Sequence, residues 1–171
     1  QSGGGADGSS SGDIVLASPT VSGNGHSGAV RVASGTAAQG NTGEIVIASG
    51  GSQFGGDSGD ISMLVGSALQ GRAGDILAVA GSSTNNGGSV TLVSGATSGS
   101  STGISGAITQ RTSDATFGSG GINLQTGTAS LANAGNVLIV AGASQRAVGG
   151  SFVVATGAGK VQGGHVRLSA G

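Results

Sequence analysis

Eleven glycines at nearly regular intervals along this chain are each followed two residues later by isoleucine, valine or phenylalanine. Successive glycines of this kind, which we call opening glycines, are 14 to 18 residues apart. A repeat this short constrains the architecture, because one unit cannot bury its own apolar face and must stack on its neighbours. The opening glycines are Gly12, Gly28, Gly43, Gly59, Gly74, Gly88, Gly106, Gly120, Gly135, Gly150 and Gly164.

Each opening glycine begins the same seven-residue pattern, which we call the apolar segment, as in GDIVLAS from Gly12 and GEIVIAS from Gly43. Its third and fifth residues are apolar in nearly every copy, so both lie on one face if the segment is a strand. Most segments are followed by a glycine, which permits a sharp corner, and the first by Pro19, which presets a turn. The pattern therefore predicts one strand and one turn per repeat.

The repeat of about 15 residues suits one turn of a β-solenoid. We predict an all-β fold, a β-solenoid (β-helix) of about eleven coils, continuous over residues 12–171. Residues 1–11 would form a Gly/Ser-rich lead-in or partial coil. The third residues of the segments would stack as the core ladder: Ile14, Val30, Ile45, Ile61, Ile76, Val90, Ile108, Ile122, Val137, Phe152 and Val166.

Composition argues against several other classes of protein. The 39 glycines among 171 residues are typical of flexible linkers, but the chain is 36% hydrophobic and its aliphatic residues are phased. A charged fraction of 8% and a net charge of −1 argue against nucleic-acid binding. No membrane span is expected, because the apolar runs are short. Cysteine, tyrosine and tryptophan are absent. We expect neither an enzyme nor a cofactor, and both histidines, His26 and His165, are expected in solvent.

Acidic residues follow the opening glycine in three consecutive repeats, at Glu44, Asp60 and Asp75. If they are stacked one strand apart, their carboxylates repel, and a divalent cation or a partner's lysines could relieve the repulsion. The alternative is a solvated strand end, where the repulsion costs little. Residues 55–61, which read GGDSGDI, also resemble the glycine and aspartate repeats that bind calcium in parallel β-rolls, although the motif occurs once.

The residues that alternate with the core ladder are unusually apolar for a solvated strand face. Strands that are apolar on both faces are usually covered on both, and large exposed apolar patches mark contact surfaces. We therefore predict an assembly face that packs laterally against neighbouring molecules. Its residues are Val15, Val46, Leu77, Val79, Leu138, Val140 and Val153.

Charge is unevenly distributed along the chain. Through Asp75, six acidic residues against two arginines give −4, and from Ile76 onward four basic residues against Asp114 give +3. Open strand ladders at the two ends of a solenoid recruit further strands. The expected partners are copies of the chain itself or a longer chain of the same repeats, and the segment that ends before Gly171 suggests an interrupted array. A trimeric fibre is an alternative arrangement.

Stretches such as SGDIVLAS, TGEIVIASG and GGSVTLVSG, joined by serine and glycine, resemble the Gly/Ser-rich repeat proteins of algae and stramenopile-like protists. They are also similar to the repeats of some viral and phage fibres. The resemblance covers residues 12–171 and implies an extracellular or surface structural role without catalytic residues. The expected function is a building block of an extracellular filament, fibre or surface appendage.

Two other functions stay open at this point. A small, cysteine-free, weakly charged rod resembles the flat β-solenoids of several antifreeze families, which bind ice through regular outward ranks of threonine. Here the outward column contains only Thr91 and Thr109 next to each other, and no threonine rank extends along that face. The second alternative is an adhesin or ligand-binding fibre module.

Overall fold

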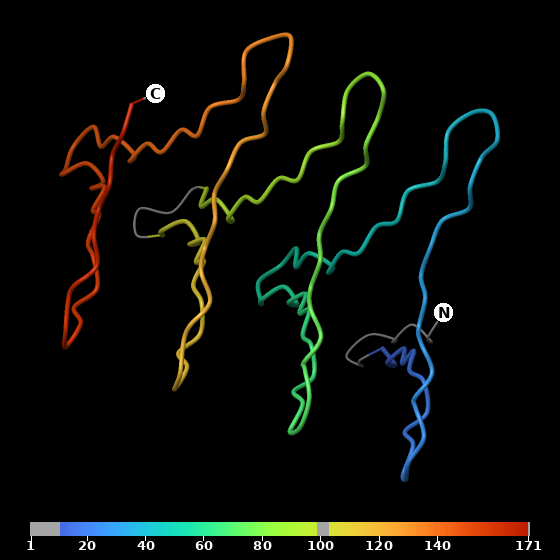
Figure 1. Cartoon of the computed structure of the whole chain (residues 1–171). Helices are drawn as coiled ribbons and strands as arrows, with labels where there is room; N and C mark the ends of the chain where they lie inside the picture. Colours follow the sequence, from blue (N-terminus) through green and yellow to red (C-terminus); the bar gives the residue numbers. More distant parts are fainter. Residues whose placement is uncertain (1–10, 99–102, 171) are drawn as a thin grey trace. The chain divides into compact units, whose positions relative to one another are not determined.

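The computed structural model describes residues 11–98 and 103–170, and these contain neither a helix nor a strand. The predicted all-β solenoid of about eleven coils is therefore wrong. Figure 1 shows the described chain as irregular coil that reverses direction repeatedly. The predicted lead-in, residues 1–11, lies outside the described residues except for its last residue.

The chain divides into two units, Gln1–Val79 and Ala80–Gly171. The first unit holds the apolar segments that begin at Gly12, Gly28, Gly43 and Gly59 and nearly all of the one that begins at Gly74. The second holds the remaining six. Both units are therefore built from the same repeated pieces.

Bends of the backbone recur with the sequence repeat. Within the described residues they lie at 23–24, 38–40, 53–56, 69–71, 84–85, 116–117, 130–132, 145–147 and 160–161. Each falls between two apolar segments. The bend at 53–56 contains Gly55 and Gly56 with φ of 90° and 106°, a left-handed conformation that glycine adopts without steric cost. The Gly/Ser-rich half of each repeat thus forms a loop.

The two ends of each loop come together at a defined point, which we call the loop base. It pairs the last residue of one apolar segment with the opening glycine of the next. A Cβ placed on the opening glycine would lie 3.1 to 4.0 Å from the side chain of that residue. The ten pairs are Ser18 with Gly28, Ser34 with Gly43, Ser49 with Gly59, Val65 with Gly74, Ala80 with Gly88, Ser94 with Gly106, Thr112 with Gly120, Thr126 with Gly135, Ala141 with Gly150, and Thr156 with Gly164.

Four loop bases in the second unit also carry a backbone hydrogen bond. The opening glycine donates its N–H to the carbonyl of the residue that follows the preceding segment, at N···O distances of 2.8 to 2.9 Å. The four bonds run from Gly88 to Gly81, from Gly106 to Gly95, from Gly150 to Gly142 and from Gly164 to Gly157. These loops are closed by one backbone contact each.

Among the described residues, no hydrophobic residue and no polar residue is buried. The chain exposes 17,176 Å², whereas a compact monomer of this mass exposes about 7,300 Å² and an unfolded chain about 23,000 Å². Only four described residues are partly buried, and all others are exposed. The four are Ser18, Ala80, Ser94 and Thr126. All four belong to loop bases, so the best-packed points of the chain are the bases of its loops.

The absence of stacking has a physical reason. A solenoid coil is stable only when backbone groups and apolar side chains of one coil meet those of the next. In this chain the regularly placed backbone contacts run across a single loop instead. Each repeat offers two or three apolar side chains against the conformational entropy of about 15 ordered residues, many of them glycine. Few apolar side chains per repeat are therefore set against a large entropic cost of ordering.

Candidate assembly surface

The apolar segments present their side chains to solvent on both sides of the backbone. We compare the third residues of the segments with the residues of the predicted assembly face. The third residue of each segment, predicted as the core ladder, is exposed by 51% to 63% in every copy except Ile14. The structure leaves all eleven ladder residues without a buried environment. The predicted core ladder is therefore an exposed set of apolar side chains in the single chain.

The seven residues of the predicted assembly face are more exposed, with fractions of 70% to 85%. Five of the seven directly follow a ladder residue in the sequence, as Val46 follows Ile45 and Leu77 follows Ile76. Consecutive side chains of an extended segment point to opposite sides. Each segment is therefore apolar on both sides and covered on neither.

The structure does not assemble a metal site from the acidic residues. Nowhere in the described ranges do three or more histidine, cysteine, aspartate or glutamate residues gather, so Glu44, Asp60 and Asp75 do not form one metal-binding group. Asp75 instead accepts a hydrogen bond from the Arg72 guanidinium at 2.7 Å, in an exposed ion pair. Such a pair contributes little to stability.

The two histidines are exposed. The Gln162 amide nitrogen lies 3.0 Å from Nε2 of His165, within one short stretch of chain. His26 lies in the loop between Ser18 and Gly28. Neither histidine has a nearby acid and nucleophile among the hydrogen bonds of the described residues.

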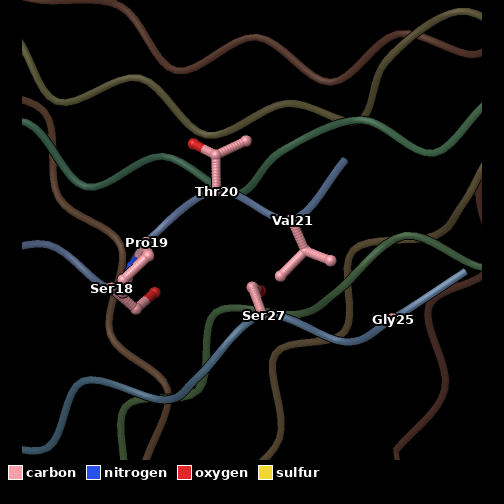
Figure 2. Close-up of a pocket in the computed structure, with 6 residues that line it drawn as sticks. All are labelled: Ser18, Pro19, Thr20, Val21, Gly25 and Ser27. Carbon is pink, nitrogen blue, oxygen red and sulfur yellow. The ribbon is translucent and has the colours of Figure 1, made fainter. Parts of the chain in front are cut away.

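A hollow of about 470 Å³ lies in that same first loop. Figure 2 shows it as a gap between the two limbs of the loop. Val21 approaches Gly25 so closely that a Cβ there would lie 2.9 Å from its Cγ1. The lining carries no titratable group: Ser18, Pro19, Thr20, Val21, Gly25 and Ser27. The hollow has the features of loop packing and offers no acid, base or nucleophile beyond hydroxyls.

No helix in the described part of the chain is long and apolar enough to cross a membrane. Exposed, evenly repeated apolar segments are thus the feature that most distinguishes this surface. No protein family, curated protein or solved structure matches this chain.

Sequence reasoning missed the loop bases. Their signal is nevertheless visible, because the seventh residue of every described segment except Val65 is serine, alanine or threonine. A small side chain at that position leaves room for the opening glycine of the next segment. The strand interpretation gave these small residues no role.

Substituting Gly150 by alanine is expected to weaken the loop base of which it is part. The added Cβ would lie 3.3 Å from the nitrogen and 3.4 Å from the oxygen of Gly142, so the hydrogen bond between the two residues must lengthen. We expect a loss of about 1 kcal/mol, seen as about fivefold faster exchange of the residue-150 amide by nuclear magnetic resonance.

Gly142→Ala is the matched control, because it alters the other partner of the same hydrogen bond where a Cβ meets nothing within 4 Å. Neither glycine has a positive φ. Equal effects of the two substitutions on the exchange rate would contradict the crowding at Gly150.

Proposed function

We propose that this chain is a non-catalytic structural repeat protein that self-associates into a filament, fibre or surface appendage. The observation that carries the proposal is the repeated exposure of apolar segments on both sides, with no buried side chain in the described residues. Exposed apolar area of this extent marks contact surfaces. Copies of the same chain are suitable partners, since each copy offers segments of the same length, polarity and spacing.

The segments also have the composition that favours intermolecular strand pairing. They are short, rich in β-branched residues, low in charge and free of proline, as in EIVIAS from Glu44 and NVLIVA from Asn136. Backbone N–H and C=O groups of these segments have no strand partner in the described chain. Association between chains would give these backbone groups hydrogen-bond partners, and it would also cover the exposed apolar side chains of the segments.

An extracellular or surface location belongs to the same proposal. It is supported by the resemblance to Gly/Ser-rich surface and fibre repeats and by the scarcity of charge. Ice binding is not favoured here, because it requires a flat, regular face and the described residues contain no sheet. Nothing in the loops favours an adhesin over a structural element.

Electron microscopy of the purified chain over a rising concentration series tests the proposal. We expect regular filaments or fibres above a threshold concentration, because the gain from burying apolar area is realised only between molecules. Particles that remain single chains up to millimolar concentration would contradict self-association. Amorphous clumps of variable width would contradict an ordered structural role.

A further inference from the structure

The division of the chain into two units coincides with its division in charge. The first unit, Gln1–Val79, has six acidic residues against two arginines and a net charge of −4. The second, Ala80–Gly171, has four basic residues against Asp114 and a net charge of +3. Two copies placed with like units together would repel, whereas opposite units attract.

The charges are also spaced by the repeat. Asp13, Glu44 and Asp60 each follow an opening glycine directly, and in the second unit no acidic residue occupies that position. Arg146 and Lys160 each stand four residues before an opening glycine, in successive loops, and both lie at bends. These acidic residues therefore recur one or two repeats apart, and the two basic residues recur one repeat apart.

These charged groups are accessible and mostly without an ionic partner in the chain. The one ion pair of the described residues is Arg72 with Asp75, inside the first unit. Glu44, Asp60, Arg146 and Lys160 are exposed. A second chain can reach them without displacing an existing salt bridge.

We infer that the copies associate with a half-chain stagger, in which the acidic unit of one copy lies along the basic unit of the next. This rests on the proposed self-association and adds its register and direction. Apolar segments supply most of the contact, and the repeat-spaced charges select which units meet. Because each copy then keeps one unit for a further partner, the contact is heterologous and propagates.

Two charge-reversed full-length variants test the stagger. The first, Asp13→Lys, Glu44→Lys and Asp60→Lys, brings the first unit to +2, and the second, Arg111→Glu, Arg146→Glu and Lys160→Glu, brings the second unit to −3. All six positions lie outside the core ladder and the assembly face. A triple variant with Asp13→Glu, Glu44→Asp and Asp60→Glu keeps the charge and is the matched control.

Assembly is followed by light scattering at about 10 mM salt, where charges interact over about 30 Å. Each reversed variant alone is expected to assemble at least about tenfold more slowly than the unaltered chain, and an equimolar mixture of the two to recover its rate. At about 1 M salt, where screening limits the range to about 3 Å, the differences should disappear.

Energy transfer between labelled copies reads the register directly, since the chain has no cysteine of its own. Ser67→Cys labels the first unit and Ser119→Cys the second. Transfer between Ser67→Cys and Ser119→Cys copies should exceed transfer between two Ser67→Cys copies. Equal transfer, or assembly rates unchanged by charge reversal, would overturn the stagger while leaving self-association intact. If the unaltered chain does not assemble at any concentration, self-association and the stagger both fail.

Discussion

Replacing Leu138 and Val140 together by lysine is expected to raise the concentration at which assembly begins by about a hundredfold. Their side chains are 83% and 75% exposed in the single chain, so the substitution disturbs no existing core. Covering each one between molecules is worth about 1.5 kcal/mol or more, and about 3 kcal/mol corresponds to a factor of roughly 150. Sedimentation of assembled against free chain measures the threshold.

The matched control is Asn123→Lys with Gln125→Lys. These residues occupy the same two positions of a neighbouring apolar segment, add the same charge to the same unit and remove no apolar side chain. We expect the threshold of this variant to rise less than about threefold, since exposed polar substitutions change stability by about 0.5 kcal/mol or less. Similar thresholds for the two variants would mean that charge, and not apolar cover, governs assembly.

Below the assembly threshold, the isolated chain is expected to show no cooperative thermal transition by circular dichroism. Its exposed area of 17,176 Å² is closer to that of an unfolded chain than to that of a compact one. Without buried apolar area, nothing offsets the conformational entropy of ordering 171 residues. Assembled material should instead show a β-type spectrum and a melting temperature that rises with concentration.

The concentration series supplies its own control, because mass action requires the transition to weaken on dilution. A sigmoidal transition whose midpoint is independent of concentration would mean that the monomer has a core of its own. That outcome would contradict the open conformation and the argument built on it. A dilute chain with a coil spectrum and no sigmoidal melting is the expected result.

Local features of the chain could be predicted from its sequence to different extents. The repeat predicted a turn directly after each apolar segment, as at Gly35 and Gly127, whereas the described bends lie a few residues further on, as at 38–40 and 130–132. The predicted alternation is visible only in part, because Ile45 is less exposed than Val46, whereas Ile47, predicted on the same face as Ile45, is as exposed as Val46. Bends and local differences in exposure depend on residues that are close together in the sequence, so the sequence indicates them at least in part.

The solenoid could not be inferred safely because its stability depends on contacts between repeats. Ile45 and Ile61 have the right polarity for stacking, but their polarity alone does not say whether the partner segment belongs to the same chain or to another. The loop bases were missed because the strand interpretation assigns no contact between the end of one segment and the start of the next. Ser94 and Ala80 fit against the next opening glycine.

Each closed loop base shortens the chain, because it holds together two residues that would lie far apart if the loop were extended. In the loop closed by the hydrogen bond from Gly88 to Gly81, the two ends are held at an N···O distance of 2.9 Å. The seven backbone steps from Gly81 to Gly88 span about 24 Å when the chain is fully extended. Under tension, the weakest closures would open first and release their length while the apolar contacts between molecules hold. A fibre built from such a chain would therefore stretch by opening loops in series, and it would shorten again when they close.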